Sequence, residues 1–239
     1  AVYDSLMEEL LALERKFPQF DAPDSPSKRV GSLPLSSFEK VRHEVEQRSF
    51  DDAFDWTEME GWESRNRRIM EKAGKKHASI SYDCELKIDG LKIILTYRTG
   101  VLMLAATRGD GLIGENVTEN VRTIGSIPLR LREPVDIVVG GEIWLPKSEL
   151  NRINREREAD GFPPFANTRN AAAGSIRQLD SSVTAKRNLG SFVYSLDRLE
   201  RSQFSEIPET QSGTLELLRH LGFSVNQHTK KFENLREVE

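Results

Sequence analysis

Three ionic side chains alternate with apolar ones in one short segment of the chain. In the segment Cys84-Glu85-Leu86-Lys87-Ile88-Asp89-Gly90, an extended strand would place Glu85, Lys87 and Asp89 on one face and the apolar residues on the other. Such a row can be ordinary surface charge. It can also hold a nucleophilic lysine between carboxylates that orient a substrate or recruit a divalent cation.

The second interpretation requires an unprotonated amine. At the reference lysine pKa of about 10.4, only about one side chain in a thousand is neutral near pH 7.5. Flanking carboxylates alone would hold the proton on, so a nearby cation or desolvation must oppose them. This interpretation therefore includes bound Mg²⁺ beside Lys87.

The elements that must position these residues mix helices and antiparallel strands without regular alternation, which predicts the α+β class. We expect a first helix with Leu6, Leu10, Leu13 and Phe17 on one face, then a proline-rich connector. Further helices are expected at 36–47, 56–75, 117–124, 147–159 and 215–221, and strands at 80–89, 92–98, 101–108, 135–145 and 192–196. The apolar stripe of the second predicted helix (Trp56, Met59, Trp62, Ile69, Met70) is assigned to core packing.

Composition limits the class of protein. The chain has 239 residues with 34 basic and 38 acidic side chains, and its single cysteine excludes an internal disulfide and a cysteine-based zinc site. No apolar run is long enough for a membrane span, so we expect a soluble cytoplasmic protein without a membrane partner. Residues 161–190 carry four basic side chains and one acidic one, which fits either a docking site for a polyanion or a solvated charged face.

Longer motifs connect these residues to a known family. Lys87-Ile88-Asp89-Gly90 matches the nucleophile motif of covalent nucleotidyltransferases, which include DNA and RNA ligases and capping enzymes. The stretches from Ala106-Thr107-Arg108-Gly109-Asp110-Gly111 to Ile124 and from Phe165-Ala166-Asn167 to Asp180 resemble the adenylation domain of bacterial NAD-dependent DNA ligases. Asp24-Ser25-Pro26, Arg29-Val30-Gly31 and Ser49-Phe50-Asp51 are similar to the same family.

The resemblance implies a nucleotidyltransferase (ATP-grasp-like DNA ligase) fold, with antiparallel sheets flanked by helices. It implies a remnant of an N-terminal helical segment that binds the nicotinamide mononucleotide half of NAD, with its connector, at 1–35, and an adenylation domain, incomplete at its C-terminus, at 36–239. The implied reaction transfers AMP from NAD to the lysine, then to the 5′-phosphate of a nick in double-stranded DNA, which the 3′-hydroxyl seals. NAD and Mg²⁺ are the implied cofactors.

The resemblance also assigns roles to single residues. The implied catalytic residues are Lys87, Asp89 and Arg108. The implied NAD-binding residues are Tyr3, Asp4, Ser49, Phe50, Glu85, Lys87, Arg108 and Glu142, and the implied DNA-binding residues are Arg169, Arg177 and Arg187.

The chain departs from the family pattern in places. Gly140 stands where an arginine is usual, Thr168 where a proline is usual and Lys92 where a small residue is common. We expect a fragment that keeps only Tyr3 and Asp4 of the first helical segment and continues elsewhere into the family's further ligase domains. Two alternatives remain: an ATP-dependent polynucleotide ligase or capping-type enzyme, and an inactive nucleic-acid-binding fragment that uses residues 161–190.

Overall fold

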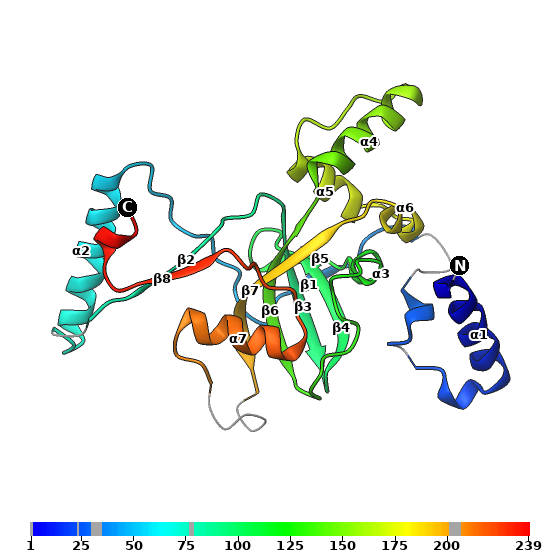
Figure 1. The fold of residues 1–239 in the computed structure, drawn as a ribbon, viewed down its shortest axis with the longest axis horizontal. Coiled ribbons are helices and arrows are strands. Elements are labelled where there is room, and N and C mark those ends of the chain that lie inside the picture. Colours follow the sequence, from blue (N-terminus) through cyan, green and yellow to red (C-terminus); the bar gives the residue numbers. More distant parts are fainter. Residues whose placement is uncertain (1, 23, 30–34, 77–78, 201–206) are drawn as a thin grey trace. The chain divides into compact units, whose positions relative to one another are not determined.

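A computed structural model of the chain describes residues 2–22, 24–29, 35–76, 79–200 and 207–239. It combines helices with antiparallel sheets, so the predicted α+β class is confirmed (Figure 1). The chain divides into two compact units. The larger unit comprises residues 1–47 and 88–225, and the smaller unit comprises residues 48–87 and 226–239.

A four-stranded antiparallel sheet forms the centre of the larger unit. Its strand order is β4-β3-β6-β7, with β3 at Leu91–Arg98, β4 at Val101–Thr107, β6 at Ile137–Trp144 and β7 at Gly190–Leu199. Thr99 and Gly100 join β3 to β4 with positive φ angles of 48° and 76°, which suits a tight hairpin turn. All four strands were predicted, with ends that differ by a few residues.

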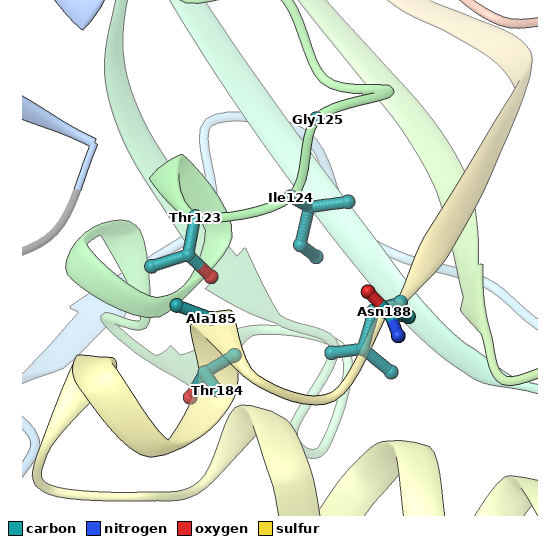
Figure 2. A pocket seen from close by; sticks show the side chains of 7 residues that line it. Thr123, Ile124, Gly125, Thr184, Ala185 and Asn188 are labelled. Carbon is teal, nitrogen blue, oxygen red and sulfur yellow. The ribbon is translucent and has the colours of Figure 1, made fainter. Parts of the chain in front are cut away.

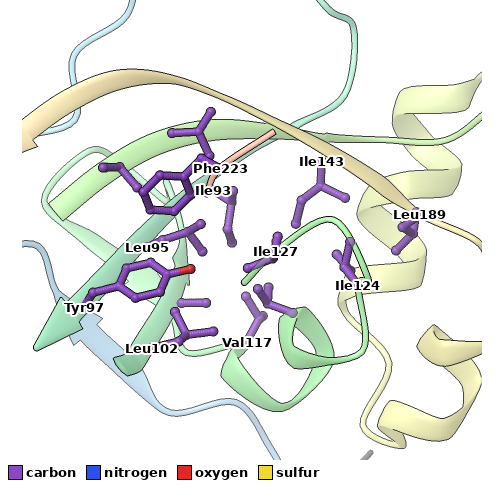
Figure 3. Packing of buried hydrophobic residues seen from close by; sticks show 14 of the residues in the cluster. Ile93, Leu95, Tyr97, Leu102, Val117, Ile124, Ile127, Ile143, Leu189 and Phe223 are labelled. Carbon is purple, nitrogen blue, oxygen red and sulfur yellow. The ribbon is translucent and has the colours of Figure 1, made fainter. Parts of the chain in front are cut away.

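One face of this sheet builds the hydrophobic core. Ile93, Leu95 and Tyr97 of β3 are fully buried on this face, together with apolar residues from the helices that cover it (Figure 3). Each such buried side chain contributes about 1.5–3 kcal/mol. The opposite face of β3 therefore carries Lys92, Ile94 and Thr96.

Five helices of the larger unit follow the start of the sheet. They are α3 (Thr118–Arg122), α4 (Lys147–Ala159), α5 (Thr168–Ile176), α6 (Ser181–Ala185) and α7 (Gln211–Leu221). Asn167 caps α5 by accepting a hydrogen bond from the Asn170 N–H, and Gly222 ends α7 with φ 105°. The predicted end of α7 at Gly222 is confirmed.

The N-terminal part begins with α1 (Val2–Lys16) and two short turns of 3₁₀ helix, η1 (Pro18–Phe20) and η2 (Pro26–Lys28). The predicted first helix is confirmed. The predicted helix at 36–47 is wrong, because β1 (Lys40–Arg42) lies there and pairs with β5 (Ile113–Glu115). A pairing between residues so distant in sequence leaves no local signal.

The smaller unit consists of α2 (Trp56–Lys72), β2 (Tyr82–Glu85), β8 (Thr229–Phe232) and the short turn η4 (Leu235–Glu237). The predicted strand at 80–89 is too long, because β8 pairs with only the four residues of β2. The structure therefore does not place Glu85, Lys87 and Asp89 in one strand face. The predicted core stripe of α2 is also wrong in part: no side chain of this helix is buried, and Ile69 is 65% exposed, although Trp62 packs against Tyr82.

Among the described residues, no helix is both long and apolar enough to cross a membrane.

Candidate functional site

Lys87 follows β2 and is the last residue of the first segment of the smaller unit, residues 48–87. Its side chain is exposed, as are those of Ser49 and Phe50 in the same unit. Glu85 is half-buried at the end of β2, where it lies opposite Thr229 of β8. The local structure therefore leaves the predicted nucleophile accessible to a substrate.

Gly90 lies where the backbone comes very close to β6. A Cβ atom at this position would lie 2.1 Å from the carbonyl oxygen of Ile143, so no other residue fits without a shift of the backbone. The close approach to β6 therefore explains why a glycine occupies the last position of the Lys-x-Asp-Gly motif in this chain.

Four side chains form a row across the sheet of the larger unit. Lys92 of β3 lies opposite Glu142 of β6, which in turn lies opposite Phe192 of β7. The register between β3 and β4, continued by one residue beyond Ile93 and Thr107, brings Arg108 beside Lys92. We call Arg108, Lys92, Glu142 and Phe192 the polar row; it lies on the sheet face opposite the hydrophobic core.

An acid and several aromatic rings meet at one end of the polar row. Glu142 is only 9% exposed, and the Tyr194 hydroxyl donates a hydrogen bond of 3.4 Å to its Oε2. The Trp144 indole stacks on Phe192 with ring centroids 5.5 Å apart. A carboxylate beside flat apolar surfaces suits a ligand that carries a heteroaromatic ring.

Within β7, Leu196 lies on the opposite sheet face from Phe192. The register between β6 and β7 shifts between Gly140 and Gly141, and Leu196 packs against the hydrophobic core. A bulge of this kind reverses the side-chain alternation that the sequence pattern assumes.

Lys92 is the half-buried cation of the polar row. Burial lowers the pKa of its ammonium group, and the nearby Arg108 lowers this pKa further, while the carboxylates of Asp197 and Glu142 raise it. Within the part of the chain that the structure describes, no carboxylate lies within ion-pair distance of its Nζ, although Glu142 is its cross-strand neighbour.

Asp197 is held on this face by two neutral donors. Its Oδ2 accepts a hydrogen bond of 2.8 Å from Gln47 Nε2, and its Oδ1 accepts one of 2.9 Å from the Ser195 hydroxyl. Ser195 also fills the space next to Gly140, since a Cβ atom there would lie 2.3 Å from the Ser195 Oγ. The departure at Gly140 thus leaves this part of the face free of a long side chain.

A tight turn holds Arg108 in place at the end of β4. The Asp110 carboxylate accepts hydrogen bonds from the N–H groups of Ile113 and Leu112, and these bonds lower its pKa. The Arg108 carbonyl contacts the His43 ring nitrogen at 3.0 Å. The Arg108 Nε is buried and has no hydrogen-bond partner among the described residues, which leaves a donor for a ligand.

The predicted DNA-binding arginines each face a carboxylate of the larger unit. Arg169 lies 3.3 Å from Asp89, and Arg177 lies 3.0 Å from Glu115. Both arginines are more than half exposed. The third, Arg187, is half-buried and 4.0 Å from Glu156, and its burial lowers its pKa.

A cavity of about 290 Å³ lies elsewhere in the larger unit, between α3 and α6 (Figure 2). It is lined by Thr123, Ile124, Gly125, Thr184, Ala185, Asn188 and Leu189. None of these is a predicted site residue, so the cavity does not belong to the polar row.

The side chains of Tyr3 and Asp4 lie outside the described residues, so their predicted role stays a prediction. No motif predicts a site role for Tyr194, Asp197 or Gln47, and Lys92 is predicted only as a departure from the family pattern. Strand alternation could have placed Lys92 and Glu142 on outward faces, but the register that pairs them is a tertiary feature.

Comparison with known proteins decides the family. The model of the NAD-dependent DNA ligase adenylation domain matches residues 35–239. The chain belongs to this family. A second model, the DNA ligase-like N-terminal NAD⁺-binding domain, matches residues 1–31.

Relatives of the chain come from several bacteria. The DNA ligase of Thermotoga petrophila is 45% identical over 236 residues, which are 99% of the chain and 33% of that protein. The DNA ligases of Thermoanaerobacter sp. (strain X514) and Desulfitobacterium hafniense are both 46% identical, over 99% and 100% of the chain and 34% and 35% of those proteins. The chain thus spans about a third of the length of these relatives.

The residues present bear on the Mg²⁺ that the family resemblance implies. Among the described residues, no three acidic, histidine or cysteine side chains converge to form a cation site. Mg²⁺ in phosphate-transferring sites is commonly held by substrate phosphates and water with one or two carboxylates. A single carboxylate such as that of Glu142 fits this arrangement, in which phosphates and water supply the other ligands.

Proposed function

We propose that this chain carries out the adenylation chemistry of an NAD-dependent DNA ligase. The Lys87 amine attacks the adenylyl phosphorus of NAD, the pyrophosphate P–O bond breaks, and nicotinamide mononucleotide leaves. The amine proton is lost to solvent, and a lysyl-AMP phosphoramidate remains. AMP then passes to the 5′-phosphate of a DNA nick, and the neighbouring 3′-hydroxyl displaces AMP to join the strand.

The observation that carries this proposal is the family match over residues 35–239, within which an exposed lysine stands in the Lys-x-Asp-Gly motif. Phosphoryl transfer depends mainly on alignment and on stabilisation of the phosphate oxygens by positive charge. An exposed Lys87 supports the role of nucleophile, and the unpartnered Nε of Arg108 supports that of a phosphate or ribose contact.

The remaining roles follow from the same family assignment. Glu85 would recognise the adenine, while Asp89 and Glu142 would contribute to the nucleotide and metal environment. Tyr3, Asp4, Ser49 and Phe50 would bind NAD. Bound Mg²⁺ would neutralise charge on the phosphate oxygens, with Glu142 as a carboxylate able to support it.

DNA contacts are assigned to Arg169, Arg177 and Arg187. Guanidinium groups bind phosphate oxygens in a bidentate manner. The exposure of Arg169 and Arg177, about two helical turns apart along α5, supports phosphate contacts along one backbone.

The wider assignments belong to the same proposal. They are an ATP-grasp-like nucleotidyltransferase fold, a nicotinamide-mononucleotide-binding remnant at 1–35 joined to the adenylation domain at 36–239, and work in DNA replication and repair in the cytoplasm. Further ligase domains would complete the sealing reaction on nicked DNA.

Intact-mass measurement after incubation with NAD and Mg²⁺ tests the covalent step. We expect a mass gain of one adenylyl group, and we expect excess nicotinamide mononucleotide to remove it by reversal of the step. Labelling from ATP instead of NAD would indicate the ATP-dependent class.

Two variants control this measurement. Lys87→Ala removes the nucleophile and should abolish the mass gain, whereas Lys147→Ala removes an exposed lysine on α4 and should leave it unchanged. A folded chain that gains no mass from either nucleotide, or a Lys87→Ala variant that still gains mass, contradicts the proposal.

A further inference from the structure

The polar row places two cations side by side. The sheet register brings Arg108 next to Lys92, and the positive charge of Arg108 contributes to the lowered pKa of Lys92. Like charges directly opposite each other in a sheet destabilise it. An anion bound between them would remove that repulsion.

The carboxylates nearby are already engaged by neutral donors. Asp197 accepts hydrogen bonds from Gln47 and Ser195, and Glu142 accepts one from Tyr194. These bonds fix the carboxylates on the sheet face, and among the described residues none of them closes an ion pair with the Lys92 ammonium. The half-buried ammonium of Lys92 and the buried Nε of Arg108 thus remain as donors that face the same part of the sheet.

We propose that Lys92 binds the phosphate of the adenylyl group together with Arg108, in a contact that rests on the proposed function. Neither the family match nor the Lys-x-Asp-Gly motif assigns a role to this position, where a small residue is common. Glu142 and the Trp144–Phe192 stack continue the row beyond Lys92, where the rest of a nucleotide would lie. Lys92 is therefore a determinant of affinity for the phosphorylated nucleoside over the nucleoside.

Calorimetric titration of the chain with AMP and with adenosine tests this contact, because the two ligands differ only in the phosphate. Lys92→Met keeps most of the side-chain length without the charge. It should lower the affinity for AMP about tenfold or more and leave the affinity for adenosine unchanged, as expected for a lost charge-assisted hydrogen bond. Lys92→Arg should retain the preference for AMP, and Lys147→Ala, which removes an exposed lysine, should behave as the unaltered chain.

Other results overturn the inference. If Lys92 only balances Glu142 and Asp197, the Lys92→Met variant will bind both ligands equally less well, with an unchanged AMP-to-adenosine ratio. An unaltered chain without preference for AMP, or an effect seen only with nicked DNA that carries a 5′-phosphate, overturns it as well. Covalent labelling of Lys87 is scored separately by mass, so failure of the proposed reaction and failure of the Lys92 contact give different results.

Discussion

At the scale of single residues, side chains near Lys87 in the sequence differ in burial and in hydrogen bonding. Lys87 is exposed, whereas Tyr82, five residues earlier, is buried and donates a hydrogen bond of 2.6 Å to Glu63 Oε1. Burial raises the pKa of Tyr82 to about 12, and the bond to Glu63 adds to this effect. The Tyr82 bond in turn lowers the pKa of Glu63, and Arg67 lowers it further. A pH-dependent link between α2 and β2 therefore lies just before Lys87, the proposed nucleophile.

Tyr82→Phe tests this link. We expect the substitution to reduce the free energy of unfolding of the smaller unit by about 1.5–3 kcal/mol at neutral pH, as for a hydrogen bond to a charged group. Because the folded pKa of Glu63 is lowered, its stabilising contribution is present above the ordinary carboxyl pKa and is lost as the pH falls through the lowered value. Because the folded pKa of Tyr82 is raised, its contribution is present below about pH 10 and is lost as the pH rises towards 12.

Urea unfolding, followed by circular dichroism at several pH values, measures this difference. The gap between the unaltered chain and Tyr82→Phe should be widest between about pH 5 and pH 10. Tyr97→Phe is the matched control, since the Tyr97 hydroxyl donates to the neutral carbonyl of Pro128 and its effect should not change in acid. A Tyr82→Phe gap that stays constant down to pH 2 contradicts the interpretation.

Arg177 supports a second prediction at this scale. Its ion pair with Glu115 is solvent-exposed, so Arg177→Ala should cost less than about 1 kcal/mol of stability. If Arg177 contacts a DNA phosphate, the dependence of log affinity on log salt concentration should become shallower by about one unit. Titration of DNA at several salt concentrations measures this slope.

Arg219→Ala is the control for that titration. Arg219 is an exposed arginine in the last turn of α7, outside the basic segment 161–190. Equal slopes for both variants and the unaltered chain would remove Arg177 from the DNA-binding surface.

At the scale of elements, the backbone at the start of α5 determines which residue types fit at Thr168. Thr168 is the first residue of α5, and Asn167 before it is extended, with φ −158° and ψ 172°. A proline at the first helical position needs no hydrogen bond from its nitrogen, and it favours an extended residue before it. The backbone at Thr168 therefore accommodates the proline that is usual in the family.

Thr168→Pro should stabilise the chain by about 0.4–1 kcal/mol, because proline reduces the conformational entropy of the unfolded state. Thermal unfolding measures the gain. Thr118→Pro provides the contrast: Thr118 is the first residue of α3, but its N–H donates to Asn116 Oδ1 at 3.1 Å, and Val117 before it has ψ 25°. This variant should be destabilised, and equal effects of the two prolines would contradict the argument.

The same elements show how far the sequence could predict the structure. Gly222 ends α7 and Gly100 turns the hairpin, because both adopt a positive φ that glycine favours and that the residue type therefore reveals. The pairing of Val41 with Gly114 has no such local signal, so a helix was predicted where β1 lies. The motif identifies Lys87, but the neighbourhood of Lys92 and Arg108 depends on strand register, which no spacing rule shows.

At the scale of the whole molecule, the chain passes between its two compact units more than once. The smaller unit joins residues 48–87 to residues 226–239, and β8 supplies the strand that pairs with β2. A two-stranded ribbon has marginal stability by itself, so both segments are needed to order this unit. Lys87 belongs to the smaller unit, and the polar row belongs to the larger one.

Deletion of residues 226–239 should therefore act selectively. We expect amide hydrogen exchange to become fast in α2 and β2, while the strands β3 and β6 of the larger unit stay protected. Deletion of residues 234–239 is the control, because it removes η4 and leaves β8 intact. Continued protection of α2 in the longer deletion would show that β8 does not order the smaller unit.

The stacking of Trp144 on Phe192 gives the chain an internal spectroscopic reporter. Trp144 lies two residues after Glu142 in β6, whereas Trp56 and Trp62 both lie in α2 of the smaller unit. A nucleotide that binds near Glu142 would change the surroundings of one indole and quench its emission. With Trp56 and Trp62 replaced by phenylalanine, intrinsic fluorescence would thus follow occupancy of the sheet face directly, without a dye or a radioactive label.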